Sequence, residues 1–467
     1  MTRDGDKANL FDAHGDSTDE KGFVERCRDD RHHFRFIVSP EEAIRMLDLK
    51  AFARDLAADM ERDLKTRLDW VAAEHWSTDN PHVHLLVRGK ADDGQNLVIS
   101  RDYISHGMRA RAEELVTLEL GHKAEREIRS ELEREVLAER WTRLDRAIAR
   151  QADDTGLIDL RPSSDDPTDR ELRRLMIGRL QRLERWSLAE PDGPGRWMVA
   201  ENAERALNEL GARRDTITIM HRALKEQGIE RPIADYVIHG PDDRPAVTGR
   251  LVGKGMHDEL TGEAFAVIDG IDGRVHYVRF PDLDRLEHAP PLGGIVATRT
   301  FEADGKSRGP LVLSVRSDLT LEAQVTASGA TWLDHQLVVR DKSPLSEGGF
   351  GREVREALQA RVDHLAREGL VRREGNRIIF ARNLLDTLHQ REIDSAAAQI
   401  AANTGLAHRP LVEGEYVAGT YRKRLSLASG RFAMIDDGLG FSLVPWRPAL
   451  ERELGHYVSG ITRAGGV

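Results

Sequence analysis

The chain has 467 residues, of which 32% are charged and only 5% are aromatic, and its net charge is −11 at pH 7. This length predicts about two to four domains, and the negative charge argues against a surface that binds nucleic acid throughout, although local basic patches remain compatible with it. The single cysteine, Cys27, excludes a disulfide framework and favours a reducing cytoplasm. No apolar run is long enough to span a bilayer, so membrane insertion is not expected.

Residues 33–120 are predicted to alternate between strands and helices. The alternating HFRFIV predicts a strand that stops at Ser39, and the sequence Ser-Pro-Glu-Glu from Ser39 has the form of a capping box that starts a helix running to about Arg67. Further strands are expected around His75, from His82 and at NLVIS, followed by a helix from Ser100 to Leu120. One continuous charged helix is predicted over residues 124–151, and a polar linker over residues 151–168.

The segment EHWSTDNPHVHLLVRG, residues 74–89, places three histidines around a polar turn. Residues i and i+2 of a strand share a face, so His82 and His84 project side by side, and pairing across the STDNP turn would bring His75 to them. Three clustered imidazoles predict a site for one divalent metal (Mn, Mg or Zn), in which Asp79 and Asn80 could orient the ligands. Unrelated strand and turn histidines are the alternative, because a His-x-His pair arises by chance about once in a chain with this much histidine.

Beyond residue 168 the sequence repeats itself. RLQRLERWSLAEPDGPGRWMV (179–199) aligns with RVDHLAREGLVRREGNRIIFA (361–381), and each predicts a helix and two strands around a glycine turn, which is the winged-helix pattern. TGRLVGKGMHDELTGEAFAVIDG (248–270) aligns with AGTYRKRLSLASGRFAMIDDG (418–438), and these short, glycine-broken strands predict small β-barrels. The arginine-rich helix at residues 170–185 fits duplex binding, or equally a solvated face of a protein-interaction module.

The predicted fold class is therefore α+β, with a first domain at residues 1–150, a linker at 151–168 and a duplicated module after it. This module comprises a winged-helix-like domain (169–240), a small β-barrel (241–300), a connecting α/β segment (301–345), a second winged-helix-like domain (346–400) and a second small β-barrel (405–467).

The string from His75 to His84, His-Trp-Ser-Thr-Asp-Asn-Pro-His-Val-His, resembles the third motif of conjugative relaxases of the mobilisation-protein and T-DNA border-endonuclease type. These enzymes are HUH (His-hydrophobic-His) nucleases. The resemblance covers roughly residues 1–150, and the later modules are similar to a C-terminal extension found on one alphaproteobacterial-style branch. One departure is Ser77, which stands where related motifs often carry an aspartate.

The resemblance implies an antiparallel sheet flanked by helices, on which the three histidines hold a divalent metal. It implies an endonuclease that nicks one DNA strand at a transfer origin by tyrosine transesterification, with a covalent 5′-phosphotyrosyl intermediate. The implied partners are single-stranded and duplex DNA at the origin, a type IV secretion coupling protein and accessory relaxosome proteins, in the bacterial cytoplasm. Arg35, Arg88 and Arg101 are candidates to contact the DNA backbone, although an ordinary surface arginine is the more common alternative for each.

The nucleophile is the largest departure from the family pattern. Relaxases place the catalytic tyrosine N-terminal to the metal motif, whereas all tyrosines of this chain follow His75: Tyr103, Tyr236, Tyr277, Tyr416, Tyr421 and Tyr457. Tyr103 lies in the first turn of a predicted helix, which suits a packing residue better than a nucleophile. We therefore expect the first domain to be incomplete at its N-terminus, with the catalytic tyrosine upstream of Met1, and this chain to bind metal and DNA without nicking.

Two other functions remain open. The chain could be a non-catalytic DNA-binding or regulatory protein with winged helices on a degenerate relaxase fold, or a hydrolase that uses a metal-bound water.

Overall fold

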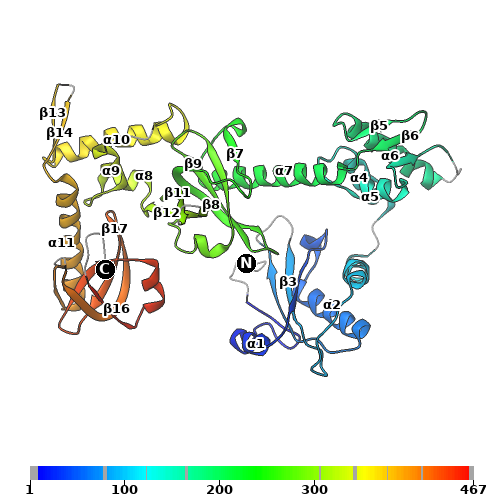
Figure 1. Ribbon diagram of the computed structural model, residues 1–467, viewed down its shortest axis with the longest axis horizontal. Coiled ribbons are helices and arrows are strands. Elements are labelled where there is room, and N and C mark those ends of the chain that lie inside the picture. The colour runs from blue at the N-terminus through cyan, green and yellow to red at the C-terminus, as the bar shows by residue number, and fades with distance from the viewer. Residues whose placement is uncertain are drawn as a thin grey trace. The chain divides into compact units, whose positions relative to one another are not determined.

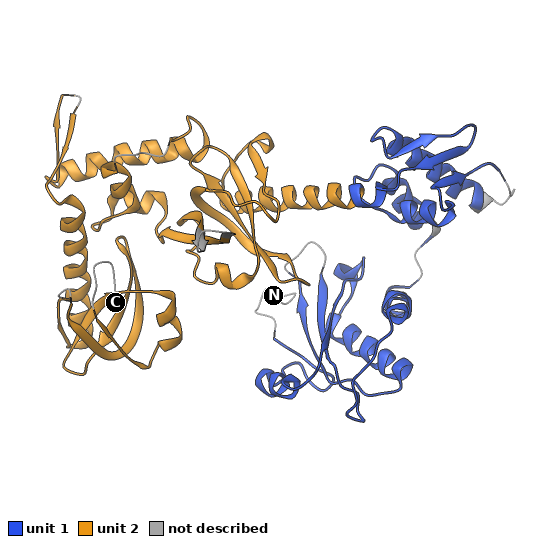
Figure 2. Cartoon of the chain, in the orientation of Figure 1, with its two compact units in different colours: residues 1–206 blue, residues 207–467 orange. Residues whose placement is uncertain are grey.

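The computed structural model describes residues 9–76, 81–121, 124–162, 167–303, 307–339, 344–375, 377–411 and 414–461. The fold is mixed α+β with mainly antiparallel sheets, as the sequence predicts. The chain divides into two compact units, residues 1–206 and 207–467 (Figure 2).

Unit 1 begins with a three-stranded antiparallel sheet in the order β1-β3-β2 (Figure 1). Its elements are α1 (Glu20–Cys27), β1 (His33–Val38), α2 (Leu49–Leu64), β2 (Trp70–His75) and β3 (His82–Arg88). The alternation of β3 sends Val83, Leu85 and Val87, each at most 1% exposed, into the core that α2 covers. The intervening residues of β3, which include His82 and His84, therefore project from the opposite face of the sheet.

The helix predicted to start at Ser39 begins ten residues later, at Leu49. A short 3-10 turn, η1 (Ala43–Arg45), is followed by Met46 in an extended conformation, which ends the helical run. The Asp48 side chain then accepts hydrogen bonds from the backbone N–H groups of Lys50 and Ala51 and caps α2. The predicted start is wrong because Met46 is needed in the core, where it is fully buried.

The helix predicted from Ser100 is confirmed, and its first part has a wider turn. The Ser100 hydroxyl accepts the Tyr103 N–H at 3.1 Å, and a π-helical turn, η2 (Tyr103–Gly107), leads into α3 (Met108–Leu120). The helix ends at Gly121, whose φ of +79° is readily adopted only by glycine. The expected NLVIS strand is reduced to a single bridge between Lys90 and Asn96.

The continuous helix predicted over residues 124–151 is instead two helices, α4 (Glu125–Val136) and α5 (Arg143–Gln151). A capping box between Thr142 and Asp145 starts α5. The guanidinium of Arg179, which is 0% exposed, forms bidentate hydrogen bonds to Asp145 at 2.8 and 2.9 Å and binds the carbonyls of the intervening segment, those of Val136, Ala138 and Arg140. The prediction of one continuous helix is wrong because Arg179, which binds the groups at the break, lies 34 to 43 residues further along the chain.

Arg179 lies on α6 (Pro167–Glu184), and α4 and α5 pack against this helix. The contact therefore joins residues on both sides of position 150, where the first domain was predicted to end. Unit 1 ends with a three-stranded sheet in the order β4-β6-β5, made by β4 (Leu157–Asp159), β5 (Ala189–Pro191) and β6 (Arg196–Val199), and with the start of α7 (Ala203–Glu226).

Unit 2 contains a six-stranded sheet in the order β12-β11-β8-β9-β10-β7 and a five-stranded sheet in the order β15-β18-β17-β16-β19, with the pair β13-β14 between them in the sequence. After α7 the elements of the first sheet are η3 (Ile233–Asp235), β7 (Tyr236–Ile238), β8 (Thr248–Asp258), β9 (Glu263–Gly270), β10 (Val275–Phe280), η4 (Leu283–Leu286), β11 (Ile295–Ala303) and β12 (Ser307–Ser317).

Helices and the second sheet follow along the chain. They are α8 (Leu321–Thr326), α9 (Trp332–Val338), α10 (Gly349–Arg367), β13 (Val371–Glu374), β14 (Arg377–Phe380), α11 (Leu384–Thr404), β15 (Ala407–His408), β16 (Tyr416–Leu427), β17 (Gly430–Asp436), β18 (Gly440–Pro445), η5 (Pro448–Glu453) and β19 (Tyr457–Ile461).

The duplication extends further towards the N-terminus than the aligned sequences. Arg361 of α10 repeats the contacts of Arg179: it forms bidentate bonds to Asp334 at 2.9 and 2.8 Å and binds the carbonyls of Val325, Ala327 and Gly329. Thr331 and Asp334 form the matching capping box at the start of α9. The repeated unit therefore begins at α4 in the first copy and at α8 in the second.

The six-stranded and the five-stranded sheet each require a glycine at the corresponding position of one strand, in β8 and in β16. A Cβ at Gly249 would lie 2.2 Å from the Asp269 carbonyl oxygen, and one at Gly419 would lie 2.4 Å from the Asp436 carbonyl oxygen. Both glycines are required because the neighbouring strand, which carries the repeated Phe-Ala-x-Ile-Asp string, approaches too closely for a side chain.

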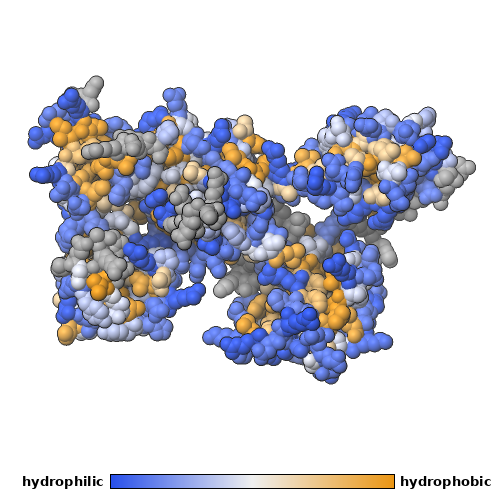
Figure 3. All heavy atoms as spheres, viewed as in Figure 1, coloured by the Kyte–Doolittle hydropathy of each residue, from blue (hydrophilic) through white to orange (hydrophobic). Residues whose placement is uncertain are grey.

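In the described part of the chain, no helix combines the length and apolar composition needed to cross a bilayer. The visible surface is largely hydrophilic, with a group of apolar atoms at the end of unit 2 that carries β13 and β14 (Figure 3). Ile378 and Ile379 of β14 are 42% and 45% exposed there.

Candidate metal centre

The pairing of β2 with β3 brings the three predicted ligands together. His75 lies directly opposite His82, and His84 lies two residues further along β3, opposite Ala73. Directly opposed residues and residues two apart share a face of a sheet, so all three imidazoles project from the same side. This is the face opposite the α2-packed core, and the sequence prediction of a clustered triplet is confirmed.

The three rings form a compact triangle. Their centroids are 4.6 Å apart for His75 and His84, 5.1 Å for His82 and His84, and 5.3 Å for His75 and His82. One ring nitrogen of each lies within 4.8 Å of the other two. Imidazole nitrogens on a tetrahedral ion are about 3.4 Å apart, so small side-chain rotations would close the triangle around a metal. The residues present fit a divalent ion.

The surroundings hold the end of β2 in place. Glu74 precedes His75 and therefore points to the other face, where its carboxylate lies 3.8 Å from the Lys50 ammonium and accepts the Trp76 indole N–H at 2.8 Å. Glu74 is 8% exposed and His82 is 6% exposed. Because these contacts tie β2 to α2 on one face, the backbone that carries His75 is held while its imidazole remains on the other.

Two of the three predicted DNA contacts share the histidine face. Arg35 on β1 is opposite Leu86 and Arg88 is opposite His33, and both register positions alternate in phase with His84. The Arg88 guanidinium is bound to the buried Asp30 carboxylate at 2.6 and 3.1 Å and to Asp69 at 3.4 Å. Its charge is therefore already compensated within unit 1.

Asp69 is the shared partner of two arginines. Hydrogen bonds from Arg26, and then from Arg88, lower the pKa of the Asp69 carboxyl below its usual value. The third predicted contact, Arg101, is exposed and lies at the start of the helix that packs on the other face of the sheet. The structure does not bring Arg101 to the histidine face.

Tyr103 is occupied by a different interaction. Its phenol donates a hydrogen bond to the Asp63 carboxylate at 2.9 Å, and Arg111 binds the same carboxylate at 2.9 and 3.1 Å. Burial, and then the Asp63 carboxylate, raise the pKa of Tyr103 to about 12. A phenol that is harder to deprotonate than usual is a poor nucleophile, which agrees with the sequence interpretation of Tyr103. The predicted orienting residues Asp79 and Asn80 lie outside the described residues.

One contribution to the sheet was missed from the sequence. Phe11, fully buried, forms both backbone hydrogen bonds of an isolated bridge to Ala72, at 2.9 and 2.8 Å, beside β2. Phe11 is a single aromatic residue in a polar, turn-rich segment, and this is the only sequence signal that could have indicated a core residue there.

Comparison with known proteins places the later modules in a family. The family model of a protein of unknown function (DUF3363) matches residues 176–308 and residues 296–467, which together are more than half of the chain. No curated protein and no solved structure matches the chain. The histidine triplet lies outside the matched residues, so the family assignment rests on the duplicated modules. This chain belongs to the DUF3363 family of proteins of unknown function.

Proposed function

We propose that this chain is a relaxase-type protein of conjugative or mobilisable DNA transfer, with a metal-dependent HUH nuclease domain followed by DNA-binding modules. The observation that carries the proposal is the triangle of His75, His82 and His84 on one face of two adjacent antiparallel strands. The implied partners are DNA at a transfer origin, accessory relaxosome proteins and a type IV secretion coupling protein.

The donor set suits chemistry on a phosphodiester. A bound divalent ion would polarise a non-bridging oxygen of the scissile phosphate and fix its position. Three neutral imidazoles leave a coordination position open and, unlike carboxylates, leave the positive charge of the ion undiminished for an anionic substrate. Arg35, on the same face of the sheet, would add a cationic contact to the neighbouring backbone.

The helical modules support duplex binding as a second part of the proposal. Three helices, α4, α5 and α6, are followed by the β5–β6 hairpin, to which β4 adds a third strand, and this arrangement supports a winged helix. Arg170 and Arg174 are exposed on α6, and Arg185, which is also exposed, directly follows the helix. In the second copy, α8, α9, α10 and the β13–β14 hairpin occur in the same order.

The nucleophile separates the proposed function from its main alternative. Because the Tyr103 phenol is bound to Asp63 and has a raised pKa, we propose that Tyr103 does not cut DNA. The same observation favours the second candidate function, a non-catalytic DNA-binding or regulatory protein on a relaxase-like fold.

The metal is tested by calorimetric titration of the full chain with Mn²⁺ and with Zn²⁺. We expect one ion per chain, and loss of measurable binding in His82→Ala/His84→Ala, since one remaining imidazole is a weak and labile site. His33→Ala is the matched control, because His33 is exposed and lies on the same sheet face at the far end of the strands. Unchanged affinity in the double variant would refute the metal centre.

A nicking assay on a supercoiled plasmid bearing a transfer origin tests the chemistry. Cleavage with a protein-linked 5′ end that disappears in Tyr103→Phe would make Tyr103 the nucleophile and contradict our assignment. Cleavage without any covalent adduct would indicate a water nucleophile. Binding without cleavage would support the non-catalytic alternative.

A further inference from the structure

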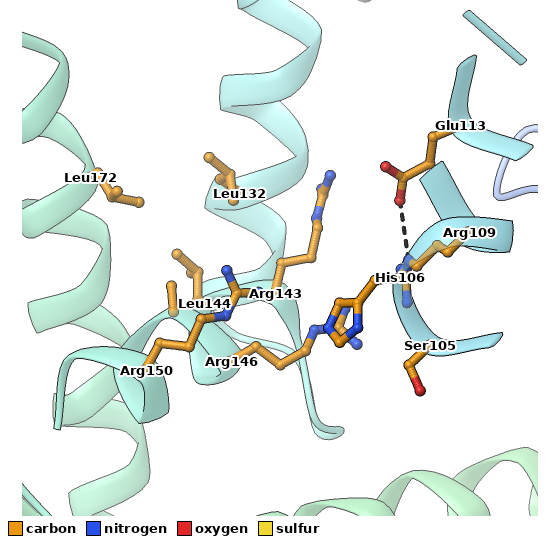
Figure 4. Close-up of a pocket in the computed structure, with 11 residues that line it drawn as sticks. Ser105, His106, Arg109, Glu113, Leu132, Arg143, Leu144, Arg146, Arg150 and Leu172 are labelled. Carbon is orange, nitrogen blue, oxygen red and sulfur yellow. Dashed lines mark hydrogen bonds and ion pairs between the residues drawn. The ribbon is translucent and has the colours of Figure 1, made fainter. Parts of the chain in front are cut away.

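Unit 1 contains a second candidate site, distinct from the histidine triangle. A cavity of about 490 Å³ lies between the η2–α3 segment and α5, with arginines at its edge and leucines behind them (Figure 4). We propose that this cavity binds a phosphate-bearing nucleotide unit, with the phosphate on Arg146 and Arg150 and the sugar or base on the leucines. The proposal rests on the proposed function in one respect: the nucleotide unit is expected to belong to a DNA strand.

The charge balance of the cavity identifies the two arginines. Arg143 is neutralised by Glu135 at 2.6 Å and Glu131 at 3.0 Å, and Arg109 by Glu113 at 3.1 Å. Arg146 and Arg150 are exposed, and neither has a carboxylate within 4.0 Å among the residues that the structure describes. They lie one turn apart on α5, so two uncompensated guanidinium groups face the same side of the helix. Such a pair favours an anionic ligand, and guanidinium groups match phosphate oxygens in geometry.

The second copy of the module has the same scaffold without these two arginines. Thr142, Leu144 and Asp145 of α5 correspond to Thr331, Leu333 and Asp334 of α9, and both sets are buried. At the positions of Arg146 and Arg150 the second copy carries His335 and Val339. The scaffold is therefore common to both copies, whereas the basic face belongs to the first copy alone.

The opposite wall of the cavity has an unusual backbone. Ser105 and His106 line the cavity from η2, a π-helical turn, and such turns are rare and frequently occur at functional sites. In Figure 4, Ser105 and His106 lie on the side of the cavity away from Leu172. The hydroxyl of Ser105 adds a neutral hydrogen-bond donor to the same wall.

The remaining surface of the cavity is apolar. Leu132 of α4, Leu144 of α5 and Leu172 of α6 line it together with Ala147. An inorganic anion makes no favourable contact with apolar side chains, whereas the flat base and the sugar of a nucleotide can pack against them. The cavity volume lies within the usual range of ligand pockets, roughly 300–1,000 Å³.

The test compares Arg146→His/Arg150→Val, which introduces the residues of the second copy, with wild type in the full chain. Binding of a fluorescent single-stranded oligonucleotide is followed by anisotropy at several salt concentrations in EDTA, so that the histidine site does not contribute. Loss of two phosphate contacts should weaken binding roughly tenfold at moderate salt and reduce the slope of log K against log[salt] by about 1.4. The control is Arg213→Ala/Arg214→Ala, which removes the same charge from exposed positions of α7, a helix that contributes no residue to the cavity.

A titration with dCMP distinguishes a free nucleotide from a DNA strand as the source of the phosphate. Binding of dCMP that the variant loses, with oligonucleotide affinity unchanged, would support the cavity as a site for a free nucleotide. Unchanged oligonucleotide affinity and salt slope, with no binding of dCMP, would overturn the proposal, as would an equal effect of the α7 control. These titrations contain no metal, so their result does not depend on whether the three histidines bind a metal ion.

Discussion

Replacing Arg179 by Met tests whether the buried guanidinium holds the first module together. The substitution keeps much of the side-chain volume but removes the two bonds to Asp145 and the donors to the carbonyls of Val136, Ala138 and Arg140. Both Arg179 and Asp145 are 0% exposed at the side chain, so the Asp145 carboxylate would remain buried without its cation. Arg361→Met makes the same change in the second copy, against Asp334.

Removing one partner of a buried, hydrogen-bonded ion pair costs about 3–5 kcal/mol. In a unit of this size each kcal/mol lowers the unfolding midpoint by about 2–4 °C, so Arg179→Met should lower that of unit 1 by roughly 10 °C. The double variant Arg179→Met/Asp145→Asn removes the uncompensated charge while keeping a side-chain oxygen that can accept the Thr142 N–H of the capping box, and should recover part of the loss.

Hydrogen exchange measured by mass spectrometry locates the effect within the full chain. In Arg179→Met, amides of α4–α6 should exchange faster while those of α8–α10 keep their wild-type rates, and Arg361→Met should give the reverse pattern. Wild-type exchange in α4–α6 of Arg179→Met, or an equal response of both modules to either substitution, would refute the view that each arginine anchors its own module.

Three further outcomes are expected. The Tyr103 phenol should titrate near pH 12, and Asp63→Asn should lower its pKa towards that of free tyrosine because a neutral amide no longer opposes the phenolate; difference spectra against Tyr103→Phe measure this, and an unchanged pKa would contradict it. Arg35→Ala should weaken single-stranded DNA binding and flatten its salt dependence in anisotropy titrations, because Arg35 shares the face of the histidines, whereas Arg88→Ala should chiefly lower the thermal midpoint, since it leaves the buried Asp30 carboxylate without its cation. Metal affinity at the histidine triangle should fall as the pH is lowered, because a protonated imidazole cannot bind a cation, and calorimetry at two pH values checks it.

The local sequence was sufficient to predict the histidine triangle and the repeat. Strand alternation fixes which side chains share a face, so the spacing of His82 and His84 and the turn before them predicted a cluster that the pairing of β2 with β3 confirms. The Gly249 and Gly419 correspondence was also visible in the sequence, because the same close approach of a neighbouring strand excludes a side chain at both positions.

Only the tertiary structure decided which charged groups are committed to each other and where the helices begin. The partner of Arg88 is 58 residues away, that of Tyr103 is 40 residues away, and that of Arg179 is 34 residues away. A capping box at Ser39 was locally plausible, but the burial of Met46 and the cap at Asp48 moved the helix. Periodicity along the chain determines which face a side chain occupies, whereas its partner comes from a distant segment that folding brings into contact, and no local pattern contains that information.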